Sequence, residues 1–293
     1  MIDGEKAKRF MKRQTKGDAS ETGLIRWVTP LLTAEFGGKI DMKDGKNTED
    51  NALDQIRKDF SPIKDAEGND KMIPFNSSIK FNLLIRDMQK DGGHITVFLK
   101  GAPEKVLKRC SRMLLKDEDG NITAADYDSG LNDGVEAANS FFGLQGERVL
   151  AFAKADLDAE EYPSDYNFDT KSWANWDALQ AGGAGNKDGW FPMNGLTLVG
   201  LVSLNDPPRP KVDVSVDLCR HAGVKVIMVT GDQPPTAAAI AHKVNIIRNP
   251  ELEYQTILDT EMIKEADGSE RKITPEEAFE KCNAIVIHGD KLA

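Results

Sequence analysis

Two stretches, Lys80-Phe-Asn-Leu-Leu-Ile-Arg86 and Ile95-Thr-Val-Phe-Leu-Lys100, decide the first half of the fold. Every second residue from Phe81 to Ile85 is apolar, and the second stretch is rich in β-branched and aromatic residues. Asp91-Gly-Gly93 lies between the two stretches, and glycine-rich sequences of this kind favour a tight turn. The sequence therefore predicts a β-hairpin.

Helical patterns precede this hairpin. A helix is expected from Asp18, its N-cap, through an apolar segment that begins at Leu24. Residues 37–70 are rich in polar residues and glycine, so we expect mostly surface loop there. One short helix is expected within that loop, around residues 53–60.

Further helices and a strand are predicted after the hairpin. Gly101-Ala-Pro-Glu104 opens a helix, because proline suits a first helical turn. Its apolar positions at helical spacing are Val106, Leu107, Cys110 and Leu114. Residues 129–145 form another predicted helix, which Gly146 ends, and a strand is expected at residues 148–157.

The composition excludes several classes of protein. The chain has 38 basic and 48 acidic residues, a net charge of −10, so it offers no broad cationic surface and nucleic acid is not an expected partner. Cys110, Cys219 and Cys282 lie far apart and form no metal-binding motif, which predicts neither a disulfide framework nor a zinc site. The longest apolar stretch, residues 196–204, is about half of the roughly 20 residues that span a bilayer, so we expect this chain alone to be soluble.

The second half of the chain has an alternating α/β pattern. Residues 156–195 are acidic, aromatic and glycine-rich, and they separate it from the first half. The predicted elements are a strand at 196–204, a helix at 211–222 ended by Gly223, a strand at Val224–Val229, a helix from about Pro235, a helix near 275–282 and a strand at Ala284–Ile287. Residues 249–274 are expected to be loop. Alternation of this kind favours a Rossmann-like sheet.

Six short motifs occur in a fixed order along the chain. They are Gly-Asp-Ala-Ser-Glu at 17–21, Pro-Phe-Asn-Ser-Ser at 74–78, Lys-Gly-Ala-Pro-Glu at 100–104, Gly-Glu-Arg-Val-Leu at 146–150, Asp-Pro-Pro-Arg at 206–209 and Val-Thr-Gly-Asp at 229–232. Together they resemble the headpiece of P-type cation-transporting ATPases. The stretch from Gly200 to Arg209 is most similar to the sodium/potassium-transporting α-subunit group.

The resemblance implies a fold that combines α+β and α/β parts. Residues 16–160 would form an antiparallel-sheet nucleotide-binding domain with helices, after an N-terminal extension at residues 1–15. Residues 161–195 would be a connecting loop. Residues 196–293 would be a partial phosphorylation domain, which is an incomplete Rossmann-like domain of the haloacid-dehalogenase type.

The resemblance also implies a site for the adenine of ATP. An exposed aromatic face can stack on a base, which is worth about 1–3 kcal/mol in base–aromatic pairs. The family pattern assigns this role to Phe75, and the alternative is a phenylalanine buried in the core. Glu21 would face the adenine as well, although it stands three residues after Asp18 and could instead complete a capping box.

Cationic side chains near the hairpin are candidates for the phosphates. Lys80 and Lys100 could meet on one side of the sheet and present two ammonium groups to a polyphosphate, or each could be a solvated surface lysine. The resemblance places Lys100 at the floor of the ATP pocket and Lys80 near its mouth, with Gly101 allowing close approach of the nucleotide to the backbone. Arg148 would bind phosphate, with a salt bridge to a local carboxylate as the alternative.

Thr230, Gly231 and Asp232 follow a predicted strand in the second half. Their hydroxyl and backbone N–H groups would sit at the carboxyl edge of the sheet, where α/β folds bind phosphate. In the resembling phosphotransferases such a threonine holds the transferred phosphoryl group. Asp206 and Arg209 would bridge ATP and the acceptor, and their alternative is turn chemistry with a local ion pair.

The phosphorylated aspartate of the resembling pumps lies in an Asp-Lys-Thr-Gly-Thr segment, which this sequence does not contain. We therefore expect an ATP-binding headpiece piece that is inactive alone, with ATP hydrolysis and ion transport only in the full-length pump. Mg²⁺ is expected only in the complete phosphorylation domain, and the partners would be the actuator and transmembrane domains. The alternative is a stand-alone nucleotide-binding or protein-interaction module without catalysis.

Overall fold

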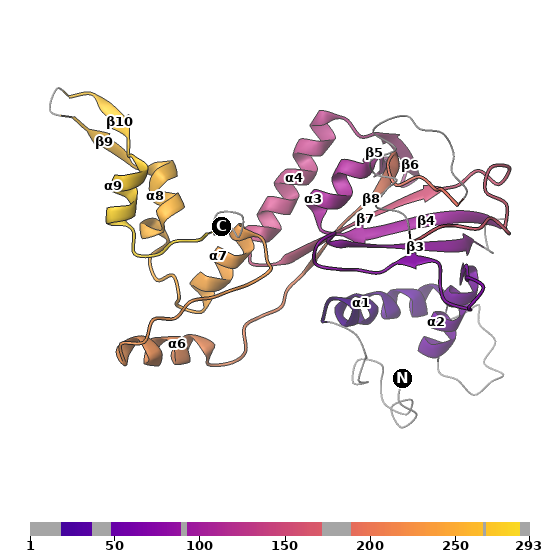
Figure 1. The fold of residues 1–293 in the computed structure, drawn as a ribbon, viewed down its shortest axis with the longest axis horizontal. Coiled ribbons are helices and arrows are strands. Elements are labelled where there is room, and N and C mark those ends of the chain that lie inside the picture. The colour runs from indigo at the N-terminus through magenta and orange to yellow at the C-terminus, as the bar shows by residue number, and fades with distance from the viewer. Residues whose placement is uncertain (1–18, 37–47, 89–92, 172–188, 266–267, 288–293) are drawn as a thin grey trace. The chain divides into compact units, whose positions relative to one another are not determined.

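The computed structural model describes residues 19–36, 48–88, 93–171, 189–265 and 268–287 of the chain (Figure 1). Contacts divide the chain into two compact units. The first unit comprises residues 1–129 and 150–202, and the second unit comprises residues 130–149 and 203–293. The expected connecting loop at 161–195 thus falls within the first unit.

The strands of the first unit form one mainly antiparallel sheet. They are β1 (Phe60–Pro62), β2 (Met72–Ile73), β3 (Phe81–Met88), β4 (His94–Gly101), β5 (Cys110–Lys116), β6 (Ile122–Asp126), β7 (Arg148–Asp156) and β8 (Leu196–Leu204). Their order is β1-β3-β4-β7-β8-β5-β6, with β2 on β3. β5 and β8 run parallel, whereas the pairs β3–β4, β4–β7 and β5–β6 are antiparallel. A mainly antiparallel sheet with helices confirms the architecture predicted for the first half.

The predicted hairpin is confirmed as β3 and β4. Phe81 lies opposite Gly101 and Met88 lies opposite His94. Alternate side chains of a strand point to the same face, and one face of the hairpin is buried. The buried residues of that face are Phe81, Leu83, Ile85, Val97 and Leu99. This face forms the centre of the core of the first unit.

Helices α1 (Ala19–Phe36) and α2 (Thr48–Asp59) confirm two of the predicted helices. Asp18, the expected N-cap of α1, lies outside the described residues. The two helices contact each other, and Figure 1 draws them on the same side of the sheet. They are therefore placed to bring side chains of α1 against the hairpin.

The helix predicted after Gly101 is shorter than expected. It comprises α3 (Pro103–Val106) and the 3₁₀ turn η5 (Leu107–Arg109), and Cys110 and Leu114 lie in strand β5 instead. The reason is a turn at residues 117–121, which the helical spacing of the apolar residues did not predict. There the Asp117 carboxylate accepts a hydrogen bond from the Asn121 backbone N–H at 2.7 Å, and β5 pairs with β6 across the turn.

Strand β8 forms where it was predicted, but in a different sheet. The prediction gave residues 196–204 to a Rossmann-like sheet of the second half, whereas β8 lies between β7 and β5 in the sheet of the first unit. The preceding segment supplies core to the same unit, since Phe168 and Phe191 are fully buried and their rings contact at 5.9 Å. The parallel partner of β8 is β5, part of which was predicted to be helical.

The second unit contains four helices that the sequence predicted, which are α4 (Ser129–Leu144), α6 (Val212–His221), α7 (Pro234–Lys243) and α9 (Pro275–Lys281). It also contains the 3₁₀ turn η6 (Pro250–Leu252) and helix α8 (Tyr254–Thr260), both within the stretch that was predicted to be loop. Gly146 and Gly223 end α4 and α6 with φ of 75° and 76°, a left-handed conformation that glycine adopts without strain. Gly146 also packs close to α7, because a methyl group there would lie 3.5 Å from Ala239.

The Rossmann-like sheet is not formed in the described residues of the second unit. Val224–Val229 and Ala284–Ile287 were predicted to be strands, but the first is irregular and the second forms only an isolated bridge, from Ala284 to Glu253. A strand needs a neighbour for its backbone groups, and no described backbone hydrogen bond joins residues 225–229 to another segment. Ile227 and Val229 are 75% and 92% exposed. The predicted loop at 249–274 instead contains α8 and the hairpin β9 (Met262–Lys264) and β10 (Glu270–Lys272).

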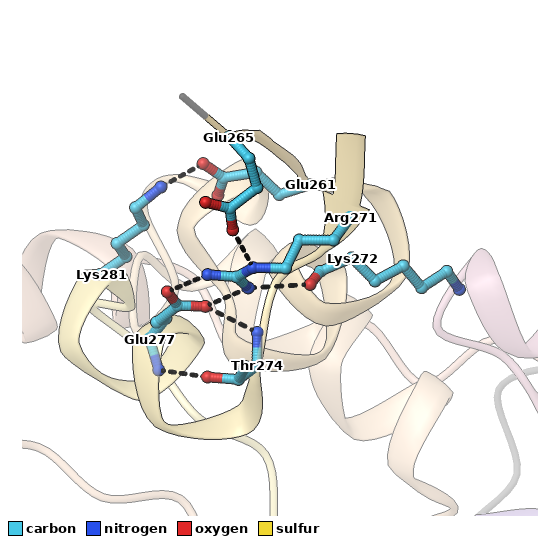
Figure 2. Close-up of polar contacts among 7 residues, drawn as sticks. All are labelled: Glu261, Glu265, Arg271, Lys272, Thr274, Glu277 and Lys281. Atoms are coloured by element: carbon cyan, nitrogen blue, oxygen red, sulfur yellow. Dashed lines mark hydrogen bonds and ion pairs between the residues drawn. The ribbon is translucent and has the colours of Figure 1, made fainter. Parts of the chain in front are cut away.

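The elements from η6 to α9 form a small module, residues 250–284, with its own core. Ile257, Ile273 and Ala278 are buried together. Figure 2 shows the polar network beside this core, in which the Arg271 guanidinium donates to both Glu277 oxygens at 2.8 and 2.7 Å. Its Nε also donates to Glu265 at 2.5 Å. Arg271 thereby ties the β9–β10 hairpin to helix α9.

The stability of this module is expected to depend on pH through Glu277. The bidentate contact with Arg271, and then the backbone N–H of Thr274, hold the pKa of Glu277 at about 2, below its ordinary value of 4.5. A lowered pKa contributes stability that is present above the unfolded value and is lost as pH falls through the folded value. We expect hydrogen exchange in α9 to quicken as pH falls from about 4.5 toward 2, after correction for intrinsic rates.

The Glu277→Gln variant should lose this pH dependence, because its side chain does not titrate. Glu280→Gln is the matched control, since Glu280 is exposed on the same helix. Equal pH dependence in the wild type and Glu277→Gln would show that another group is responsible.

Candidate functional site

The loop between β2 and β3 presents Phe75 to solvent. The Phe75 side chain is 64% exposed, which rules out the alternative of a buried core residue. Asn76 orders the loop, because its Oδ1 accepts hydrogen bonds from the backbone N–H groups of Ser78 and Ile79, each at 3.0 Å. The sequence analysis gave Asn76 no role, although Asn followed by Ser-Ser is typical of such side-chain turns.

Lys80 ends this loop in a left-handed backbone conformation with φ of 58°. Its carbonyl accepts a hydrogen bond from the backbone N–H of Ala102 at 2.9 Å. Its ammonium lies 3.5 Å from Oε1 of Glu104, which belongs to α3. Both the backbone carbonyl and the side-chain ammonium of Lys80 therefore have partners. The sequence did not predict the contact with Glu104.

Gly101 lies directly beside the Lys80 backbone. A methyl group at Gly101 would lie 2.6 Å from the Lys80 carbonyl oxygen and 2.5 Å from Cβ of Phe81, both too close for real contacts. The sequence interpretation explained this glycine by close approach of a nucleotide. The structure supplies a separate reason, which is that no side chain fits between β4 and the start of β3.

Lys100 and Glu21 form an ion pair, although they are 79 positions apart in the sequence. Lys100 extends from β4, and Glu21 lies in the first turn of α1. Lys80 pairs with a carboxylate of α3 and Lys100 with one of α1, and no described contact joins the two ammonium groups. Each lysine therefore has its own carboxylate partner, one on α3 and one on α1.

Asn82 lies opposite Lys100 in the β3–β4 register. Its Oδ1 is buried and accepts no hydrogen bond from the residues that the structure describes. A buried acceptor without a donor costs about 1–3 kcal/mol.

In the second unit, four of the predicted residues come together. Arg148 Nε donates to Oδ1 of Asp232 at 2.9 Å, and its Nη1 lies 3.8 Å from Asp206. The Thr230 hydroxyl donates to the other Asp232 oxygen at 2.7 Å. The salt bridge that was the alternative for Arg148 is thus present. Gly231 is exposed next to this cluster, and Arg209 is exposed without a described side-chain contact to it.

The described part of the chain has neither a membrane-spanning helix nor a cluster of metal ligands. No helix there is both long enough and apolar enough to cross a membrane. No group of three or more His, Cys, Asp or Glu side chains there could hold a metal ion.

Comparison with known proteins decides the family. Residues 2–211 match the model of the P-type ATPase, cytoplasmic domain N. This chain belongs to that family.

The sodium/potassium-transporting ATPase subunit alpha of Hydra vulgaris is 33% identical over 288 residues, which cover 96% of this chain and 22% of that protein. The subunit alpha-2 of Gallus gallus is 35% identical over 96% of this chain. The potassium-transporting ATPase alpha chain 2 of Rattus norvegicus is 35% identical over 83% of this chain. The chain spans about a fifth of the length of these P-type ATPases, 22%, 22% and 19% respectively.

The match to domain N includes most of the predicted site. Within residues 2–211 lie Glu21, Phe75, Lys80, Lys100, Gly101, Arg148, Asp206 and Arg209. Thr230, Gly231 and Asp232 follow the end of that match. The first-unit part of the site, around β3 and β4, is thus the part for which membership of the domain N family is most informative.

Proposed function

We propose that this chain binds ATP in its first unit and serves as the nucleotide-binding part of the headpiece of a P-type cation-transporting ATPase. The observation that carries the proposal is the ion pair of Glu21 and Lys100, two residues that the family pattern assigns to one pocket and that α1 and β4 bring together. ATP hydrolysis and ion transport would belong to the full-length pump. The actuator and transmembrane domains would be the partners there.

The first unit offers suitable groups for each part of ATP. Phe75 presents an exposed ring on which adenine could stack. Lys80 and Lys100 supply the cations that phosphates require.

The second unit would contribute to phosphoryl transfer only in the complete pump. We propose that residues 203–293 correspond to part of a haloacid-dehalogenase-type phosphorylation domain, in which Thr230, Gly231 and Asp232 support the phosphoryl group. The contact of Arg148 with Asp206 and Asp232 supports this view, because it places a guanidinium beside the Thr-Gly-Asp motif. Mg²⁺ would neutralise phosphate charge in the complete domain.

Phe75→Ala is expected to weaken ATP binding by roughly 5- to 150-fold, because base–aromatic stacking is worth about 1–3 kcal/mol. Lys100→Ala should weaken it by at least about 10-fold, since hydrogen bonds to charged groups contribute about 1.5–3 kcal/mol. Isothermal titration calorimetry of the whole chain with ATP measures both effects.

Phe141→Ala is the matched control for Phe75→Ala. Phe141 is also an exposed phenylalanine, but it lies on α4 of the second unit, so its removal should leave the affinity unchanged. Absence of ATP binding by the wild type, or equal binding by all variants, would sink the proposal and leave the alternative of an interaction module.

A further inference from the structure

Backbone hydrogen bonds fix the conformation of Lys80. A left-handed conformation costs a residue with a side chain about 1–2 kcal/mol, so the surroundings must hold it. The Lys80 N–H donates to the Asn76 carbonyl at 2.9 Å, and the Lys80 carbonyl accepts from Ala102 at 2.9 Å. Gly101 leaves room for that carbonyl. The strain and the contacts together direct the Lys80 side chain toward the start of α3.

Glu104 is fixed by the same short segment. Pro103 begins α3, and the Lys105 N–H donates to the Ala102 carbonyl at 2.9 Å. Ala102 thus connects to Lys80 on one side and opens the helix turn that carries Glu104 on the other. Lys80 and Glu104 therefore extend from two backbone segments that are hydrogen-bonded to each other through Ala102, and their side chains are held close together.

The pair is held but remains exchangeable. The ammonium-to-carboxylate distance is 3.5 Å, and the two side chains are 39% and 37% exposed. Half-exposed ion pairs are weak, because water screens the charges and competes for the hydrogen bonds. A phosphate group carries more charge and more acceptor oxygens than a carboxylate, so it can displace Glu104 from Lys80.

We propose that Glu104 is a positioning residue that competes with the phosphates of ATP for the Lys80 ammonium. The inference rests on the proposed function, because it assumes that Lys80 meets phosphate. In the ligand-free chain the carboxylate holds the ammonium near the start of α3 and neutralises it. ATP binding then exchanges one partner of Lys80 for another, and Glu104 lowers the affinity by the strength of the pair that is broken.

The expected effect is small and has a definite sign. Glu104→Gln should bind ATP about two- to fivefold more tightly, the range that corresponds to a half-exposed ion pair. Adenosine, which has no phosphates, should bind the wild type and Glu104→Gln equally. The effect should vanish when Lys80 is removed, so Lys80→Ala and Lys80→Ala/Glu104→Gln should bind ATP equally.

Calorimetry of the whole chain with ATP and adenosine tests these four proteins. Glu118→Gln is the control for overall charge, since Glu118 is an exposed carboxylate in the β5–β6 turn and its removal also makes the net charge less negative. Circular dichroism verifies that every variant is folded. Glu104→Asp keeps the charge and should bind ATP less tightly than Glu104→Gln.

Four results would overturn the inference. Weaker ATP binding by Glu104→Gln would mean that the carboxylate aligns Lys80 for phosphate. An equal gain in Glu118→Gln, or a gain that persists without Lys80, would mean a general charge effect. If the wild type binds no ATP at all, the proposed function itself fails, and a wild type that binds ATP with no gain in Glu104→Gln refutes this inference alone.

Discussion

Gly101→Ala is expected to lower the free energy of unfolding of the first unit by about 3 kcal/mol, the cost of overpacking a close contact. The added methyl group would lie 2.5 Å from Cβ of Phe81, 2.6 Å from the carbonyl oxygen of Lys80 and 2.7 Å from Cα of Phe81. Two of these atoms are backbone atoms, so no side-chain rotation relieves the clash. Urea unfolding followed by far-ultraviolet circular dichroism measures the loss as a lower midpoint.

Gly134→Ala is the matched control. Gly134 lies in helix α4, and no atom lies within 4 Å of the position where its methyl group would be. Alanine is the better helix former by about 0.8–1 kcal/mol, so this variant should be slightly stabilised. An unchanged midpoint for Gly101→Ala would show that β3 and β4 can separate at little cost, contrary to the packing seen here.

Backbone amides of Lys225 to Val229 are expected to exchange with deuterium at least about a thousandfold faster than those of β3 and β4. Amides in the core sheet exchange only through global opening, whose free energy is about 5 kcal/mol or more in a stable domain. Those of residues 225–229 have no described hydrogen bond to another backbone group. Mass-spectrometric hydrogen exchange on the whole chain compares the two segments directly.

More generally, the inner strands of the first-unit sheet, including β8, should be better protected than residues 225–229. The matched comparison within the second unit is α7, whose backbone is hydrogen-bonded as a helix. Protection of residues 225–229 equal to that of β3 would contradict the structure and would indicate that this apolar run pairs with another strand, including one in a second molecule.

Local sequence patterns predicted the elements whose signals lie within a few residues. The β3–β4 hairpin followed from alternation around a glycine turn, and α4 followed from its periodicity and Gly146. In each case the burial pattern, the turn and the end signal agreed with one another. The mainly antiparallel sheet of the first half was therefore predictable.

Patterns failed where pairing with a distant strand decides the conformation. Residues 110–116 fit a helix and a strand equally well by their apolar positions, and pairing with β6 and β8 selects the strand. The opposite error occurred at Val224–Val229, which has strong strand propensity and no described partner. Propensity alone cannot supply the hydrogen bonds that a strand requires.

For the candidate site, the sequence motifs predicted residues but not their contacts. Motif order identified Lys100 and Glu21, and the predicted hairpin identified Lys80, but only the fold shows that Lys100 meets Glu21 across 79 positions. Glu104 lies inside a quoted motif and was passed over, because its significance depends on where the Lys80 side chain points. Gly101 was noticed, and the packing reason for it required the neighbouring backbone.

The place of β8 limits how this protein can be divided in the laboratory. A gene segment that stops near residue 160, where the first half was predicted to end, would omit the strand that lies between β7 and β5. Two groups of strands, β1-β3-β4-β7 and β5-β6, would remain. In each group the edge strand next to the missing β8 would have unpaired backbone N–H and C=O groups. An expressed first unit should therefore retain residues through 204, or carry a linker that returns β8 to its position.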